Sequence, residues 1–175
     1  MTLERAQHPE RLDGLAAFLR PAVEELLLRV RRDHGIVLMI VHGYRSVREQ
    51  WELYSRGRAL NRETGEWEVV TPQAVVTKAR PGLSAHNVVT HVSGEPAAVG
   101  VDLVPITGGG TPLWDTPIGV WFTIYEEAWK VGLDPLGDEI GAFVEWDKGH
   151  FEEPGWQLKV NGLGLIRPVS GVQQI

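Results

Sequence analysis

The sequence of 175 residues contains no cysteine. This absence excludes a disulfide framework, a thiol nucleophile and any zinc site built on cysteine, so a bound metal would need histidine and carboxylate ligands. The sequence also has no Lys/Arg-rich run, and its 17 basic residues stand against 23 acidic ones, for a formal net charge of −6. We therefore do not expect a nucleic-acid partner.

Long hydrophobic runs are absent as well. No apolar run reaches the ~18–20 residues that span a bilayer, and residues 1–14 lack the apolar segment of a secretory signal. We expect synthesis in the cytoplasm, with any export dependent on another protein. The length favours one domain that buries its own core, and 43% hydrophobic with 23% charged residues is typical of a soluble globular chain.

Helical patterns precede scattered strand patterns along the chain. Apolar residues recur at helical spacing over 12–30, where Pro21 is expected to start or kink a second segment and Gly35 to end it. Ser46 and Glu49 form a capping-box pattern that predicts a helix start. The predicted elements are a helical region over 12–34, a strand over 36–41, a helix over 47–56, an irregular hairpin within 59–82, a strand over 97–106, a helix over 118–132, a strand with a turn over 142–152, and a glycine-rich surface tail over 154–175. This order indicates an α+β fold.

Three short stretches contain the residue types of a reactive site: SAHN at 84–87, VGVDLVP at 99–105 and WDKGHFE at 146–152. On the predicted strand Gly100 and Asp102 share one face, because side chains alternate. Small residues beside a carboxylate leave room for a metal with its substrate, or for a closely packed helix. In the third stretch, a turn at a glycine would bring the aspartate and the histidine together.

A catalytic zinc ion needs three protein ligands and an open position, with a general base nearby that does not bind the metal. Among the His and carboxylate residues, His86, Asp102 and His150 are the candidate ligands and Asp147 is the candidate base. Arg45 lies just after a predicted strand, at a helix entrance. It could hold a substrate carboxylate or the developing oxyanion.

Each of these residues also has a structural interpretation. A lone histidine is often a hydrogen-bonded core residue, and Asp102 could form a buried ion pair with an arginine. Arg45 could be a surface or capping charge. His42 and His91 are possible substitute ligands, and Trp146 and Trp156 are the tryptophans most expected to line a cleft.

Taken together and in order, GYRSVREQWELYSRGR, VVTKARPGLSAHN, AVGVDLVP and EWDKGHFE resemble the zinc D-alanyl-D-alanine carboxypeptidase and L-alanyl-D-glutamate endopeptidase family. Bacteriophage endolysins of that group look most similar. The resemblance spans Gly43 to Glu152, within one domain over 1–175. It implies the hedgehog/DD-peptidase-like fold, a small antiparallel sheet with helices packed around it.

The resemblance implies one Zn²⁺ held by His86, Asp102 and His150, with Asp147 as the base and Arg45 as the substrate-binding arginine. Supporting positions of the family match Gln50 and Ser84. The implied reaction is attack of a zinc-held water on a stem-peptide amide of bacterial peptidoglycan.

The bond expected to be cut is L-alanyl-D-glutamate, and a D-alanyl-D-alanine carboxypeptidase is the near alternative. A non-catalytic zinc-containing binding module is the alternative of another class. We expect a monomer that acts on the wall after holin-type release, as a lysis enzyme, or as part of a virion.

The chain departs from the family pattern between the first two ligands. His86 and Asp102 are 102 − 86 = 16 positions apart, whereas the family usually has seven. Residues 88–97 therefore look like an insertion of about nine residues, a length that a surface loop absorbs at modest entropic cost. This insertion, which includes His91, is expected to lie beside the metal and to reshape specificity. Glu145 is the second choice for the base.

Overall fold

The computed structural model describes residues 8–135 and 148–167, so Glu145, Trp146 and Asp147 lie outside the described residues. The helices are α2 (Arg20–His34), α3 (Val47–Tyr54), α4 (Ile118–Lys130), α5 (Trp156–Lys159) and the short 3-10 helices Pro9–Gly14, Pro72–Ala74, Ala85–Asn87 and Val160–Leu163. The strands are β1 (Leu38–His42), β2 (Arg58–Leu60), β3 (Trp67–Val69), β4 (Val89–Thr90), β5 (Gly100–Pro105), β6 (His150–Glu152) and β7 (Leu165–Ile166). The predicted α+β class is confirmed.

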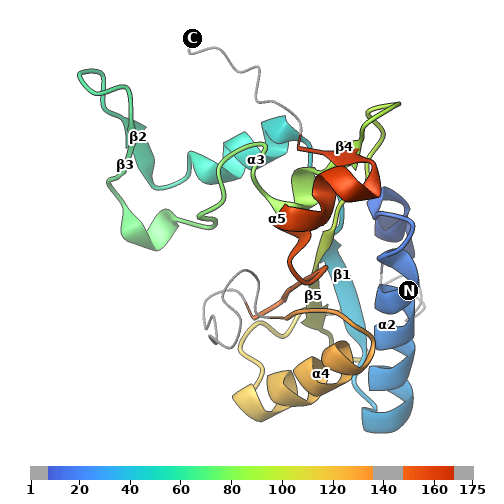
Figure 1. Ribbon diagram of the computed structural model, residues 1–175. Helices are drawn as coiled ribbons and strands as arrows, with labels where there is room; N and C mark the ends of the chain where they lie inside the picture. The colour runs from blue at the N-terminus through green and yellow to red at the C-terminus, as the bar shows by residue number, and fades with distance from the viewer. Residues whose placement is uncertain (1–7, 136–147, 168–175) are drawn as a thin grey trace.

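The central sheet is antiparallel and has the order β1-β5-β6. Helix α2 lies along it and packs against α4, as Figure 1 shows. The main core fills the space between these elements and contains, among other buried residues, Val23, Leu26, Leu38, Ile40, Leu103, Trp121, Ile124 and Phe151. The middle strand β5 is buried over most of its length, which is why its one carboxylate, Asp102, requires polar partners.

Helix α2 forms where the sequence predicts it. Its buried residues Val23, Leu26 and Val30 recur at helical spacing, and a proline occupies the first turn, where no backbone donor is needed. Gly35 ends the helix with φ of 66°, a left-handed conformation that glycine adopts without strain. No helix among the described residues is long and apolar enough to cross a membrane.

A capping box starts α3, as predicted. The Ser46 hydroxyl accepts a hydrogen bond from the Glu49 backbone N–H at 3.2 Å, and the Glu49 carboxylate accepts one from the Ser46 N–H at 2.8 Å. Gln50 is fully buried in the first turn of this helix. Arg45 directly precedes the N-cap residue Ser46, so the capping box fixes the backbone next to Arg45.

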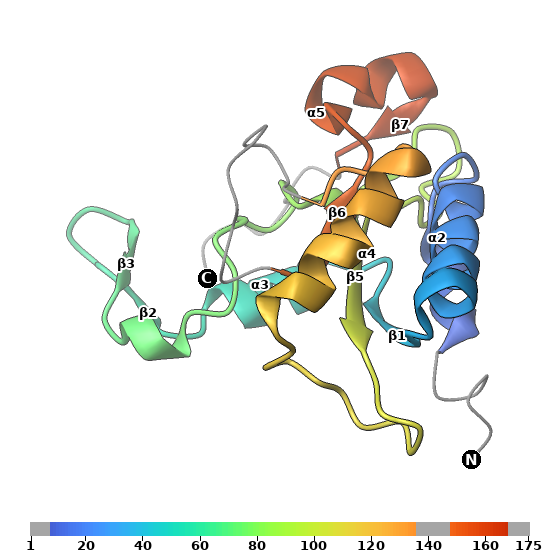
Figure 2. The same cartoon turned by 90° about the horizontal axis from the view of Figure 1, so that it is seen from below.

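The predicted irregular hairpin is present as β2 and β3, which extend away from the rest of the chain in both views (Figures 1 and 2). Two aromatic contacts tether it to α3. The rings of Trp67 and Trp51 pack edge to face, with their centres 4.9 Å apart. The Arg58 guanidinium lies 4.1 Å from the ring centre of Tyr54.

The C-terminal segment differs from the predicted surface tail. Trp156, Val160 and Leu165 are buried in the main core, because α5 and β7 turn their apolar side chains inward. The expectation that Trp156 lines a cleft is therefore wrong, since this side chain is only 2% exposed.

The insertion over 88–97 folds against this C-terminal segment. Strand β4 pairs with β7, and the backbone N–H of His91 donates to the Gly164 carbonyl at 3.0 Å. The insertion is thus hydrogen-bonded to the C-terminal part of the described residues. A role of the insertion in specificity stays a prediction.

Candidate metal centre

The register of the central sheet brings three polar side chains into one row. Asp102 on β5 lies directly opposite His42 on β1 and His150 on β6. Residues that face each other across antiparallel strands project to the same side of a sheet. An irregularity between Ile40 and His42 adds a residue to β1, so that His42 rather than its neighbour is aligned with Asp102.

His86 reaches the same point from the short helix Ala85–Asn87. The Ser84 hydroxyl accepts the His86 N–H at 3.3 Å, and the Asn87 side chain donates to the Arg45 carbonyl at 2.7 Å. In return, the Arg45 N–H donates to the His86 carbonyl at 2.9 Å. These bonds join two segments that are far apart in sequence, and they place Ser84 next to His86 and not at the centre of the group.

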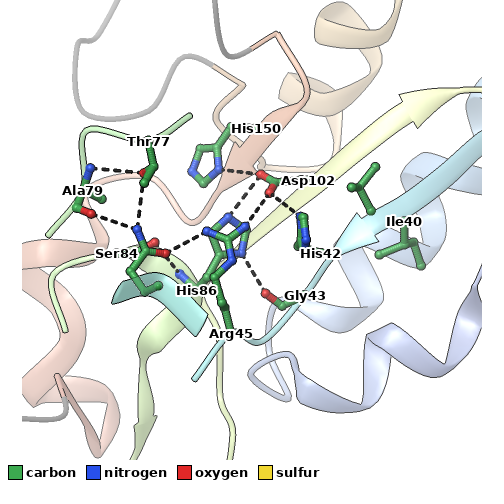
Figure 3. Close-up of polar contacts among 12 residues, drawn as sticks. Ile40, His42, Gly43, Arg45, Thr77, Ala79, Ser84, His86, Asp102 and His150 are labelled. Carbon is green, nitrogen blue, oxygen red and sulfur yellow. Dashed lines mark hydrogen bonds and ion pairs between the residues drawn. The ribbon is translucent and has the colours of Figure 1, made fainter. Parts of the chain in front are cut away.

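The three predicted ligands converge. His86 Nε2 and His150 Nδ1 each lie 3.1 Å from the same oxygen of Asp102, Oδ1 (Figure 3). One potential ligand atom from each residue lies within 4.8 Å of the others, and among the described residues this is the one such group of three His, Cys, Asp or Glu residues. His86 is buried, whereas Asp102 and His150 remain partly exposed, with side chains 19% and 16% accessible.

The outer nitrogens of the two histidines show where the ring protons lie. His86 Nδ1 is 2.7 Å from the carbonyl oxygen of Gly43, and His150 Nε2 is 2.8 Å from a carboxylate oxygen of Glu152. Both oxygens are acceptors, so both outer nitrogens donate. The lone pairs of the neutral rings therefore point inward, toward the Asp102 carboxylate, and this arrangement requires a positive charge at the centre, from ring protons or from a metal ion.

The residues fit zinc. Two imidazole nitrogens and one carboxylate oxygen form the donor set of catalytic zinc sites, which keep a fourth position open. Ligand atoms about 2.0–2.1 Å from a tetrahedral zinc ion lie about 3.3 Å apart, close to the 3.1 Å from each histidine nitrogen to the carboxylate oxygen. The hydrogen bonds to the outer nitrogens supply the orientation that metal-binding histidines usually have.

The second oxygen of Asp102, Oδ2, has its own partners. Arg45 Nη2 lies 3.2 Å from it and His42 Nδ1 lies 3.3 Å from it (Figure 3). Burial by itself raises the pKa of this carboxyl, but without a metal the positive charge of His86 and hydrogen bonds from His150, His42 and His86, in their protonated forms, outweigh it and hold the pKa of Asp102 well below its usual range. Asp102 is therefore ionised.

Gln50 holds Arg45 in place. Arg45 Nη1 donates to Gln50 Oε1 at 2.8 Å, and the Gln50 amide donates to the Ala79 carbonyl at 2.8 Å and to the Thr77 hydroxyl at 3.3 Å. Arg45 is buried, and its Nε has no hydrogen-bond partner among the described residues. An arginine held this way has its position and its charge set beside Asp102 before any anionic group approaches.

The small residue beside Asp102 has a clear function. A Cβ atom on Gly100 would lie 2.7 Å from the Ala85 Cβ and 3.0 Å from the Cε1 of His150. The space that the sequence left open on this face is thus filled by a candidate ligand and by the segment that carries His86.

Six of the seven predicted site residues lie together: Arg45, Gln50, Ser84, His86, Asp102 and His150. The seventh, Asp147, lies outside the described residues. His91 is wrong as a substitute ligand, since it is exposed on the insertion and absent from the group. His42 contacts the group through Oδ2 of Asp102. Sequence reasoning assigned no role to Glu152, although it closes the last motif.

A cavity of about 550 Å³ lies elsewhere, at the start of β1 and the end of β5. It is lined mainly by apolar residues, with Trp114 and Asp115 among them, and contains none of the site residues. The polar convergence around Asp102 is therefore the better candidate for chemistry.

No protein-family model matches the chain. The solved structures that it resembles include a mutant of the vancomycin resistance D,D-pentapeptidase VanY in complex with Zn(II), at 19% identity over 85% of this chain and 78% of that chain, with a TM-score of 0.53. VanYB in complex with D-alanine-D-alanine matches at 18% identity over 86% and 78%, with a TM-score of 0.53. The chain has the VanY fold. The LdcB LD-carboxypeptidase matches at 17% identity over 86% of this chain and 66% of that chain, with a TM-score of 0.50.

The predicted hedgehog/DD-peptidase-like fold is thereby confirmed: a small antiparallel sheet with helices around it.

Proposed function

We propose that this chain is a zinc-dependent peptidase that hydrolyses stem-peptide amide bonds of bacterial peptidoglycan. The observation that carries the proposal is the convergence of His86 Nε2, Asp102 Oδ1 and His150 Nδ1, with both ring lone pairs directed inward. The fold adds support, because one protein that shares it is a D,D-pentapeptidase in complex with Zn(II).

His86, Asp102 and His150 would hold the metal. A zinc ion bound there supplies a Lewis acid, which polarises the scissile carbonyl and makes an attacking water acidic near neutral pH. Asp147, three positions before His150, is proposed to take the proton from that water and to pass it to the leaving amine. The motif resemblance supports this assignment of Asp147.

Arg45 is proposed to bind the substrate. Its guanidinium is held at one end by Gln50 and at the other by Asp102, so its direction is set before a substrate arrives. The positive charge of the guanidinium is suited to a carboxylate or to the oxyanion that forms during hydrolysis.

The L-alanyl-D-glutamate bond is our first choice of target. A D-alanyl-D-alanine carboxypeptidase is the second, and it is favoured by one observation: VanYB, which shares the fold, is a complex with D-alanine-D-alanine. Arg45 could bind the free carboxylate of such a substrate.

Digestion of purified peptidoglycan separates these activities. The zinc-loaded chain is incubated with peptidoglycan, and the products are identified by mass spectrometry beside an Asp102→Asn control. Release of peptides that begin with D-glutamate, with L-alanine left on the glycan, indicates the L-alanyl-D-glutamate endopeptidase, and release of free D-alanine indicates the carboxypeptidase. A chain that binds zinc but yields neither product, under any metal loading, contradicts the proposal and leaves a binding module.

We also propose that the enzyme acts as a phage endolysin, which the order of motifs from Gly43 to Glu152 supports. Its expression in a bacterium with and without a co-expressed holin tests this setting. Lysis that requires both the holin and an intact Asp102 is the expected result. Lysis that proceeds equally without the holin contradicts release by that route.

A further inference from the structure

Glu152 is a buried carboxylate to which the proposed reaction assigns no role. It lies on β6, two positions after His150, and is only 4% exposed. Residues two apart on a strand share a face, so Glu152 lies beside the His150 ring while Phe151 between them points into the core. Its Oε2 is 2.8 Å from His150 Nε2.

The charges around Glu152 are unusual for a buried carboxylate. No Lys or Arg side chain within the described ranges forms an ion pair with it, and the pair that it makes is with His150. Burial of an ionised carboxylate is costly unless a positive charge or several donors compensate it. His150 thus lies between two carboxylates, with Asp102 on its inner nitrogen and Glu152 on its outer one.

The sheet holds this arrangement in place. Glu152 is paired with Gly100 in the strand register, and His150 is paired with Asp102. The ring fits in the space that the missing side chain of Gly100 leaves. Backbone hydrogen bonds of 2.9 Å in both directions with Asp134 hold the Glu152 main chain on its other side.

We propose that Glu152 is a positioning residue for the metal. It holds the proton of His150 on Nε2, aims Nδ1 at the centre shared with His86 and Asp102, and increases the basicity of that nitrogen through a charged hydrogen bond. This inference rests on the proposed function and extends it to the residue that determines how strongly the third ligand binds zinc.

The test compares Glu152→Ala and Glu152→Gln with the parent chain. Zinc affinity is measured on the full chain by competition with a chromogenic chelator. Glu152→Ala is expected to bind zinc about 10–100-fold more weakly, the range found when such outer partners of metal ligands are removed. Glu152→Gln keeps an oxygen that can accept a hydrogen bond from the His150 ring, so its zinc affinity should lie between those of the parent and Glu152→Ala. If Glu152→Ala does not fold, the zinc affinity of Glu152→Gln still tests the role of the carboxylate charge.

The matched control is Glu153→Gln. Glu153 is the next residue and also a carboxylate, but it pairs with Lys159 at 2.9 Å, away from the histidines. Its loss should leave zinc affinity unchanged. Nitrogen NMR of the metal-free chain adds a readout that a purely structural role would not move: the ring proton of His150 should be on Nε2 in the parent and distributed over both nitrogens in Glu152→Ala.

Zinc affinity of Glu152→Ala within about twofold of the parent, or an unchanged position of the ring proton, would overturn this inference alone. A parent chain that binds no zinc would instead overturn the proposed function.

Discussion

Glu127, which is buried, and Asp102, which is partly exposed, both have histidine and arginine around them, but the two clusters differ in their source of positive charge. Glu127 on α4 accepts hydrogen bonds from Arg29 Nε at 2.8 Å and Lys130 Nζ at 2.6 Å, and lies 3.2 Å from His34 Nε2. Asp102 faces two histidines through one oxygen and Arg45 with His42 through the other. Both carboxylates have lowered pKa values.

The difference lies in what supplies the positive charge. Glu127 is neutralised by Arg29 and Lys130, which are cations at all ordinary pH values, so its cluster is complete as an ion pair that joins α2 to α4. At Asp102 the inner nitrogens of His86 and His150 present lone pairs to the carboxylate, because their outer nitrogens donate elsewhere. Acceptors at the outer nitrogens of both histidines are the orientation that metal-binding histidines usually have.

The strongest test of this difference is Asp102→Asn beside Glu127→Gln. Asp102→Asn removes a charged ligand and should abolish tight zinc binding and lower peptidoglycan hydrolysis by roughly 10³-fold or more, since metal activation supplies several kcal/mol of the barrier reduction. Glu127→Gln should retain zinc stoichiometry and hydrolysis while it lowers the thermal midpoint. Zinc content by elemental analysis and product assays measure both. Equal loss of zinc in Asp102→Asn and Glu127→Gln would contradict the assignment of the metal to the Asp102 cluster.

Gly100→Ala tests the space for His150. Its new Cβ would meet the Ala85 Cβ and the His150 ring, so we expect a loss of about 1–3 kcal/mol in the free energy of unfolding from overpacking together with weaker zinc binding. Gly119→Ala is the matched control, because nothing lies within 4 Å of its Cβ position on α4. It should leave the free energy of unfolding within about 0.5 kcal/mol of the parent and leave zinc affinity unchanged, because Gly119 is in the first turn of α4. Unchanged zinc affinity in Gly100→Ala would contradict the packing argument.

Acid should affect the Glu127 cluster in a defined range. Hydrogen bonds from Lys130 and then Arg29 lower the pKa of Glu127 from 4.5 to about 2, against the opposing effect of burial, and His34 adds to the lowering. The native pKa is below the unfolded one, so the stabilisation is present above pH 4.5 and is lost as the pH falls toward 2. Thermal midpoints from pH 6 to about 2 should decline less steeply in Glu127→Gln than in the parent. Glu126 is exposed, so Glu126→Gln should show the same dependence of the thermal midpoint on pH as the parent. If the thermal midpoint of Glu127→Gln also falls as steeply as that of the parent, Glu127 is not the source of this pH dependence.

The smallest effect is expected at His42. Its side chain is 47% exposed, and Asp102 keeps Arg45 as a partner when His42 is removed. An exposed pair contributes about 1 kcal/mol or less, so His42→Ala should weaken zinc binding by less than about fivefold. The same chelator competition measures it. A loss as large as that of Asp102→Asn would mean that His42 is itself a ligand.

Local patterns accounted for much of the fold. Helical spacing with Gly35 predicted α2, and the Ser46 capping box predicted the start of α3, because both depend on neighbours within a few residues. The tail was predicted wrongly for the opposite reason. Burial of Trp156 and Leu165 depends on contacts with segments far away in the sequence, which a glycine-rich composition does not reveal.

Local spacing and ordered motifs were enough to predict the α+β class and to select six residues that the structure brings together in the candidate site, because motifs specify which residue types recur together. Their arrangement came from contacts between distant segments: the register that aligns Asp102 with His150, the acceptors at the outer histidine nitrogens, and the contrast between Asp102 and Glu127. These features depend on hydrogen bonds between strands and loops 16 to 48 positions apart, from His86 to Asp102 and from Asp102 to His150. The direction of a lone pair is a property of such contacts, and no local pattern contains it.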